Sequence, residues 1–364
     1  MSEERISSSE LFTLVFGFII GSTIVLPIAP MAKKDSWLAE GLAVIGGTLL
    51  ALIYTSLARR YPGKSLVQYA PLSLGRYVGK AFGVLYIWYA LHLGALVLRN
   101  FGELITLVLL PGTPPVVVFG VMIFMIALAV RQGVEVLGRT SQFLFIIIVF
   151  NIIIITVLII PRASLDNLRP ILGEGWLPVL KGAWEELAFP YGETVLFAMV
   201  LPHLNRPHQA RSTFLKALVT GGVLLGIATA RNWAVLGNLT SSLIFPSFEV
   251  SRMISIADFI ERVEALVLVT WISVGFIKIG VCYYAATTGL AQWLGLQDYR
   301  PLVYPIGIIM AALSLLVYAN VHEMLDFAAR IWPPYSLPFQ IVIPLIMLFA
   351  ATWRRAGGKA PANY

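Results

Sequence analysis

Residues 187–201 read LAFPYGETVLFAMVL, an apolar stretch with a single carboxylate, Glu193, directly behind the helix-breaking run Pro190-Tyr191-Gly192. A charge at bilayer depth costs at least ~2.5–3.5 kcal/mol on insertion scales, so it rarely persists there without a role. Pro removes a backbone hydrogen bond and Gly adds backbone freedom, so we expect the helix to break where the charge enters. Broken helices are tolerated at that depth only where they line a cavity or are buried in protein. The stretch therefore predicts a ligand or ion site inside a polytopic membrane protein.

The composition of the whole chain supports a location in the lipid bilayer. Of the 364 residues, 58% are hydrophobic and 12% are charged, whereas soluble domains average about 25% charged residues. Although the net charge is +7, the basic residues are scattered over short segments, so positive-inside topology explains them better than nucleic-acid binding. The acidic, serine-rich start is unlike a signal peptide, and Ser7 and Glu10 have capping-box spacing. We expect an uncleaved first helix there.

A helix that crosses a bilayer needs ~20 mainly apolar residues. Ten segments satisfy this, and we expect membrane helices at roughly 10–31, 37–58, 81–110, 114–131, 140–161, 182–203, 213–236, 263–292, 302–320 and 336–353. With the N-terminus inside, the inner segments hold about twice as many Lys and Arg residues as the outer ones, which predicts both termini on the inner, cytoplasmic side. No linker or low-complexity tract divides the chain. The sequence therefore predicts an all-α polytopic protein with one transmembrane domain over residues 1–364.

The first predicted span contains a second candidate break, Gly21-Ser22-Thr23-Ile24-Val25-Leu26-Pro27. Small and hydroxyl residues followed by Pro fit a local unwinding that frees backbone amides and carbonyls. The first and sixth spans correspond if the ten helices form two inverted halves of five, approximately 10–161 and 182–353. Interrupted helices at corresponding positions of such halves indicate a transporter-type site near the membrane midplane. The alternative is that Gly and Pro only permit close helix packing, but packing does not explain Glu193.

The chemistry of two broken helices suits a zwitterionic ligand. Free amides at a half-helix N-terminus favour a carboxylate, whereas free carbonyls favour an ammonium group or a cation. Residues near the middle of the third span can add pocket wall. The predicted ligand-binding residues are Gly21, Ser22, Thr23 and Ile24 in the first span, Tyr89 and Leu93 in the third, and Tyr191, Gly192, Glu193 and Leu196 in the sixth. Such a pocket suits a small aliphatic amino acid better than a nucleoside.

This arrangement resembles the LeuT-like five-plus-five inverted repeat of the amino acid–polyamine–organocation superfamily, whose first helix breaks at a Gly-x-Gly-Ile type motif. The chain has Gly21-Ser22-Thr23-Ile24, in which the second Gly is replaced. More specifically, the chain resembles the spore germination permease family, the B subunits of nutrient germinant receptors. Four stretches carry this resemblance in consistent order: RYPGKSL at 60–66, NLRPIL at 167–172, FPYGE at 189–193 and FEVSRMI at 248–254.

The resemblance implies a subunit of the spore inner membrane that senses a small nutrient, commonly an amino acid. It also implies that this subunit works beside an A subunit and a lipoprotein C subunit. Three functions remain open at this point: a receptor that passes a ligand-induced change to its partners, an amino acid transporter with proton coupling through Glu193, and an ion or water conduit gated by partner subunits. A ligand can shift a conformational equilibrium only by its differential affinity for the two states. The resemblance favours the receptor.

Lys278 lies deep in the long eighth span, too far from either end for easy snorkelling. Sodium-coupled members of the superfamily hold a cation between the first and eighth helices, and some members place a Lys amine there from a different helix. We therefore consider that the Lys278 ammonium braces carbonyls of Gly21–Thr23 as a cation surrogate. The alternative is a structural ion pair of Lys278 with Glu193 or Glu103.

The remaining polar residues suggest no chemistry on a substrate. Arg99 and Glu103 lie four residues apart near the outer end of the third span, where they can pair as part of an outer gate or as an ordinary interfacial ion pair. His92 has no metal-ligand partner at suitable spacing. The chain lacks a Gly-x-Ser-x-Gly elbow, a phosphate-binding Gly-rich loop and a His-Glu-x-x-His motif, and its single Cys282 excludes clustered thiolates. We expect no enzyme, no cofactor and no metal site.

Overall fold

The computed structural model describes residues 4–24, 26–27, 29–254 and 264–356. Within these residues the chain consists of helices and short loops, with one isolated bridge between Ile6 and Leu204. Val25, part of the predicted first break, lies outside the described residues. The predicted capping box is present, because Ser7 and the side chain of Glu10 exchange hydrogen bonds with each other's backbone amides and fix the start of the first helix.

The first five predicted spans are present, with small changes at their ends. They comprise α1 (Ser8–Ile20) with the 3-10 turn η1 (Ser22–Ile24), η2 (Pro30–Asp35) with α2 (Ser36–Arg60), α4 (Arg76–Leu104) with its extension η3 (Ile105–Leu109), α5 (Pro115–Gln132) and α6 (Val134–Ile159). A short helix, α3 (Leu66–Leu74), connects the second span to the third. The fifth span begins before the predicted residue 140 because Gly133, at φ +112°, separates α6 from α5. The turns η4 (Ile160–Arg162) and η5 (Leu165–Leu168) follow it.

The last five spans begin with the broken sixth segment. It comprises α7 (Trp176–Glu186), η6 (Leu187–Tyr191), η7 (Gly192–Met199) and η8 (Leu201–His203). After the turn η9 (Pro207–Gln209) come α8 (Ala210–Leu236), η10 (Gly237–Ser242), α9 (Pro246–Arg252), α10 (Glu264–Leu294), η11 (Arg300–Leu302) and α11 (Val303–Leu316). The tenth span comprises α12 (Val321–Asp326), η12 (Phe327–Ile331), α13 (Trp332–Leu337), η13 (Pro338–Val342) and α14 (Ile343–Ala356).

The tenth span starts earlier than predicted, at Val321 rather than near 336. Pro333 and Pro334 do not end it, because they lie in the first turn of α13, where a missing backbone N–H is tolerated. The wider π-helical turns η12 and η13 on either side keep the chain helical.

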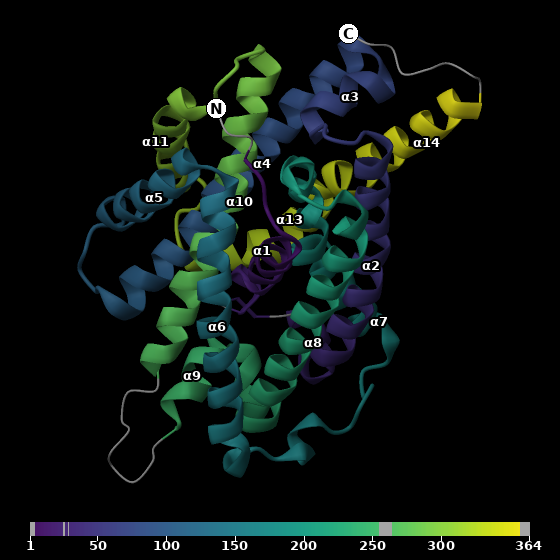
Figure 1. Ribbon diagram of the computed structural model, residues 1–364. Coiled ribbons are helices and arrows are strands. Elements are labelled where there is room, and N and C mark those ends of the chain that lie inside the picture. Colours follow the sequence, from purple (N-terminus) through teal and green to yellow (C-terminus); the bar gives the residue numbers. More distant parts are fainter. Residues whose placement is uncertain (1–3, 25, 28, 255–263, 357–364) are drawn as a thin grey trace.

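Seven helices among the described residues are long and apolar enough to cross a membrane. The first and ninth spans are shorter apolar helices, and the sixth is interrupted. In Figure 1, α1 lies in the middle of the bundle, with α8 and α2 on one side and α6 and α10 on the other. Because α1 is surrounded by protein, its break can be satisfied by neighbouring helices rather than by lipid.

Candidate functional site

The first span breaks at Gly21. Its φ and ψ of 6° and −129° end α1, and η1 follows with a tighter 3-10 turn. A Cβ atom at Gly21 would lie 2.5 Å from the carbonyl oxygen of Phe18 and 2.5 Å from Cδ of Lys278. Only glycine fits here, because the side chain of Lys278 passes directly over the backbone of the break.

The sixth span breaks at Phe189, whose φ and ψ of −146° and 102° are those of a strand rather than a helix. The Phe189–Pro190 peptide bond is cis. Beyond it the chain continues as the 3-10 helix η7, and long 3-10 segments are uncommon because their hydrogen bonds are poorer than those of an α-helix. Both breaks predicted from the sequence are therefore confirmed.

The two breaks meet at a buried ion pair between Glu193 and Lys278. Lys278 Nζ lies 2.7 Å from Glu193 Oε2, and both side chains are fully buried. The ammonium also faces the rings of Phe18 and Phe189, with 5.1 Å and 4.5 Å from Nζ to the ring centroids. Cation–π contacts of a desolvated ammonium contribute up to ~2 kcal/mol. One cation thus connects α1, the sixth span and α10.

Of the two interpretations of Lys278, the ion pair with Glu193 is the one present. Among the described residues, the ammonium donates no hydrogen bond to a carbonyl of Gly21–Thr23, although its carbon chain lies against Gly21. From the residues that the structure describes, neither Glu193 carboxylate oxygen accepts a well-aligned hydrogen bond. The pair is held by charge and by its aromatic surroundings, and any part in coupling stays a prediction.

Gln340 fills the backbone gap of the sixth span. Its amide nitrogen donates to the carbonyl oxygen of Ala188 at 2.8 Å, and a Cβ atom at Gly192 would lie 2.0 Å from its Oε1. Trp332 donates to the same Ala188 carbonyl at 3.3 Å, and Tyr54 donates to the carbonyl of Gly192 at 3.2 Å. The tenth and second spans therefore satisfy carbonyls that the break leaves free. A lone Gln in an apolar span was the available sequence signal for this role.

The predicted aromatic walls point elsewhere. Tyr191 is fully buried against α2 and α8, where its hydroxyl donates to Glu40. Tyr89 packs on the tenth span, stacked on Phe339 with 4.7 Å between ring centroids, and accepts a hydrogen bond from Gln340. Leu93 and Leu196 are buried in the same hydrophobic core, and Ser22 is fully buried. These side chains are already in contact with protein, so an open pocket at the midplane is not formed by them.

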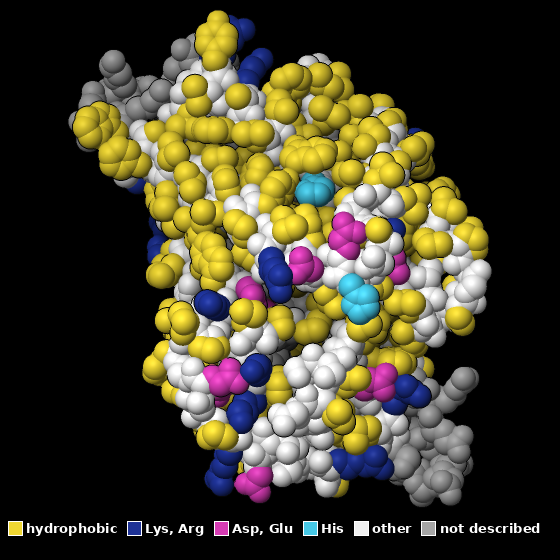
Figure 2. Space-filling model, turned by 180° about the vertical axis from the view of Figure 1, so that it is seen from behind, with side chains coloured by type: hydrophobic (Ala, Val, Ile, Leu, Met, Phe, Trp, Pro, Cys, Tyr) yellow, Lys and Arg dark blue, Asp and Glu magenta, His cyan; other side chains and the backbone are white. Residues whose placement is uncertain are grey.

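An open cavity of about 330 Å³ lies next to the breaks, towards α9 and the start of the sixth span. Of the predicted binding residues, Thr23 and Ile24 line it; Phe189, Glu185 and Glu186 contribute from the sixth span. Figure 2 shows a face of the molecule whose upper part is mainly apolar, while charged side chains gather around a hollow in the lower part. The cavity is small, near the lower end of the ~300–1,000 Å³ of ligand pockets.

Arg99 and Glu103 form the predicted pair, with 2.5 Å between Arg99 Nη2 and Glu103 Oε1. Arg99 also lies over the ring of Phe119 and reaches the carbonyl of Ser314 at 3.5 Å. The pair therefore lies among α4, α5 and α11, and neither residue lines the cavity. Its proposed part in an outer gate stays a prediction. No group of three or more potential metal ligands occurs among the described residues.

Comparison with known proteins identifies the family. A family model described as "Spore germination protein" matches residues 5–322. The chain belongs to this family of spore germination permeases. It is 31% identical to spore germination protein KB of Bacillus subtilis over 98% of this chain and 96% of that protein. Spore germination protein YndE of the same organism is 26% identical, with 98% of each chain covered. Spore germination protein A2 is 27% identical over 85% of this chain and 86% of the relative.

Solved structures establish the fold. This spore germination permease matches a Na⁺-coupled sialic acid symporter with a TM-score of 0.67 at 11% identity, over 99% of this chain and 92% of the other. It matches MhsT in complex with L-phenylalanine with a TM-score of 0.65 at 10% identity, over 96% and 99%. A transporter of the nucleobase-cation-symport-1 family in a closed conformation gives 0.68 at 13% identity, over 97% and 91%. The predicted LeuT-like fold with broken first and sixth helices is confirmed, and at such identities nothing further is transferred.

Proposed function

We propose that this chain is the nutrient-sensing transmembrane subunit of a spore germinant receptor. A small germinant, commonly an amino acid, binds beside the broken first and sixth helices and changes the contacts between them. The observation that carries this proposal is the buried ion pair between Glu193 and Lys278, placed where both breaks meet α10.

A buried ion pair at this position suits a switch better than a purely structural contact. Removing two charges from water is costly, and their attraction repays this only if the geometry is good. Among the described residues, neither oxygen of Glu193 accepts a well-aligned hydrogen bond, although the Trp332 indole lies near it, and the ammonium faces Glu193 and two aromatic rings. A ligand whose polar groups compete for either partner can therefore favour a second arrangement of the breaks. The affinity difference between the two arrangements sets how far the equilibrium moves.

We propose that the change is passed to an A subunit and a lipoprotein C subunit in the spore inner membrane, and the membership of the spore germination family supports this. Most of the described chain is membrane helix, so the signal must leave through helix and loop surfaces. Both termini on the cytoplasmic side, and inverted halves bounded near 10–161 and 182–353, remain part of this proposal.

The transporter fold keeps a second candidate open, an amino acid transporter with alternating access. Reconstitution of the full chain in liposomes separates the two. We expect a labelled germinant to bind saturably without counterflow, because a sensor needs only to bias its conformations. Saturable exchange of labelled amino acids would instead establish transport.

Glu193→Gln is the informative variant in this assay and in spores. We expect it to abolish the nutrient response, because the neutral amide no longer holds Lys278. Glu135→Gln is a matched control, since Glu135 pairs with Arg139 on the exposed surface of α6. A Glu193→Gln receptor that binds and germinates normally would remove this residue from the mechanism.

A further inference from the structure

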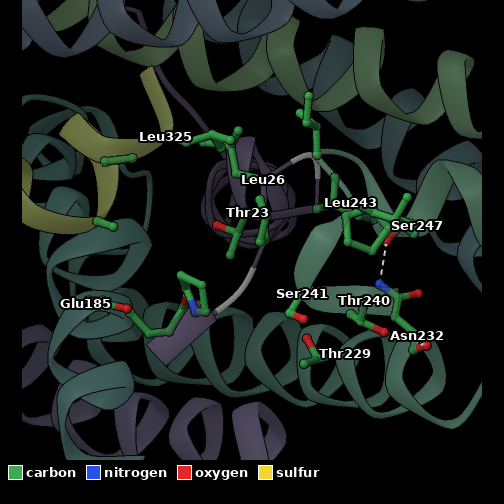
Figure 3. A pocket seen from close by; sticks show the side chains of 18 of the residues that line it. Thr23, Leu26, Glu185, Thr229, Asn232, Thr240, Ser241, Leu243, Ser247 and Leu325 are labelled. Carbon is green, nitrogen blue, oxygen red and sulfur yellow. Dashed lines mark hydrogen bonds between the residues drawn. The ribbon is translucent and has the colours of Figure 1, made fainter. Parts of the chain in front are cut away.

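The cavity beside the breaks has one acidic end and one end rich in hydroxyl groups. Figure 3 shows Glu185 on one side and Thr229, Ser241 and Asn232 on the other, with Thr23 of the first span above them. The walls between these ends are apolar and include the side chains Leu26, Phe189, Leu225 and Leu325. Such a cavity recognises a small ligand by polar groups at its two ends.

The acidic end contains a carboxylate with an unused oxygen. Glu186 is only 3% exposed; its Oε1 accepts a hydrogen bond from the Ala29 amide at 2.8 Å, whereas no N–H or hydroxyl group of the described residues donates to its Oε2. The carboxyl group of Glu40 in α2 lies within hydrogen-bonding reach of Glu186, and no N–H or hydroxyl group of the described residues donates to its Oε2. Glu185 contributes a third unpaired oxygen at the cavity wall. Buried polar atoms are rarely left unpaired without a reason.

The charges of this region favour a cation. Among the described residues, no Lys or Arg forms an ion pair with Glu40, Glu185 or Glu186. The described lining of the cavity contains no Lys or Arg, and its one histidine, His322, is exposed. Carboxylates that lie close together in a low-dielectric site repel one another, so a bound cation stabilises them.

The opposite end offers a hydroxyl group for the rest of the ligand. Thr229 is 4% exposed, lines the cavity, and its Oγ1 has no hydrogen-bond partner in the described part of the chain. Asn232 is already occupied, because it accepts from Arg231 and donates to Ser247 at 2.9 Å. The volume and the apolar walls exceed what a bare ion needs, and they fit an aliphatic body between the two ends.

We propose that this cavity binds the ammonium group of a small aliphatic amine or amino acid, with Glu186 as its principal acceptor and Glu185 beside it. The inference deepens the proposed function, on which it rests, by naming the chemical group that is sensed. Glu186 is the residue immediately before the interrupted segment η6, and it also holds Ala29 in the linker after the first break. An ammonium group bound there acts on both broken helices at once.

The test is binding of four probes of similar shape to the full chain in lipid nanodiscs. The probes are isobutylamine, isobutanol, isobutyrate and L-valine, and their binding is measured by calorimetry. We expect isobutylamine and L-valine to bind saturably, at least tenfold more tightly than isobutanol, and isobutyrate not to bind. Glu186→Gln, which keeps an acceptor for the Ala29 amide, should weaken isobutylamine at least tenfold. Glu174→Gln, on an exposed loop where Glu174 pairs with Lys33, should change nothing.

A second variant guards against a folding defect in Glu186→Gln. Ala228→Phe fills the cavity without altering a charge, and we expect it to abolish isobutylamine binding while the protein elutes as a single species. Equal binding of isobutanol and isobutylamine, or binding unaffected by both variants, would overturn the inference. Spores separate this failure from that of the proposed function: if Glu193→Gln still abolishes the nutrient response, the sensing role stands and only the ammonium site is wrong.

Discussion

At the scale of single residues, the ion pair between Glu193 and Lys278 predicts that the effects of substituting these two residues on stability are strongly coupled. Both side chains are fully buried, so either single change leaves one charge without its partner. Removing one partner of a buried pair typically costs ~3–5 kcal/mol. We expect Glu193→Gln and Lys278→Met each to lower the thermal midpoint in detergent clearly, and the double variant to be more stable than either single variant.

A double-mutant cycle at a surface pair provides the comparison. Glu135 and Arg139, four residues apart on α6, are likewise in contact, but they are exposed, and such pairs contribute only ~0.3–0.5 kcal/mol. Their cycle should give little coupling. If the losses of stability caused by Glu193→Gln and Lys278→Met simply add in the double variant, the two residues do not act as a pair.

At the scale of the helical element, the first break depends on the absence of a side chain at Gly21. In Gly21→Ala the new Cβ would meet the carbonyl oxygen of Phe18 at 2.5 Å, and that backbone atom cannot move away as a flexible side chain can. We expect a loss of stability of roughly 1–3 kcal/mol, as for other overpacked sites, measured by thermal unfolding.

Gly41→Ala is the matched control, because nothing lies within 4 Å of its Cβ in α2. It should be neutral or stabilise the helix by up to about 1 kcal/mol. A Gly21→Ala protein as stable as Gly41→Ala would mean that the break relaxes freely.

The same elements show what the sequence can and cannot predict. Both breaks were predictable, because Gly21 and Pro190-Tyr191-Gly192 interrupt long apolar runs. The pairing of Glu193 with Lys278 was one of the two alternatives for Lys278, because ionisable side chains inside a membrane usually pair with one another. The direction of Tyr191 was not predictable. Side-chain direction follows the 3.6-residue period only within one regular helix, and that phase is lost where Phe189 is extended and a 3-10 helix follows.

At the scale of the whole molecule, the helices form two sets with extensive internal packing. In the first set, α8 packs on both α1 and α2, and α2 packs on α7; in the second, α4, α5, α10 and α11 all contact one another, while α1 also packs on α10 across the boundary. The ion pair connects the sixth span to α10, and Gly21 of the first span lies against the same lysine, so this site lies on the boundary between the sets. Packed helices move more readily as rigid bodies than by deformation, because protein interiors are dense. A germinant that acts here is therefore expected to shift one set against the other.

Two engineered disulfides test that motion. Gly94→Cys places a Cβ 3.2 Å from that of native Cys282 and links α4 to α10 within one set. Gly17→Cys with Ile277→Cys, in a Cys282→Ser background, places two Cβ atoms 3.5 Å apart and links α1 to α10 across the boundary. The second separation lies at the lower end of the ~3.5–4.5 Å of natural disulfides, and the first, at 3.2 Å, lies just below it. We expect oxidised spores with the first link to germinate normally and those with the second to stop responding until a reductant is added. Both links join α10 to a neighbouring helix. A difference in germination between the two variants therefore reflects the boundary between the sets and not the presence of a crosslink. A normal response with the second link, once mass spectrometry has verified the disulfide, would show that sensing proceeds without relative motion of the two sets.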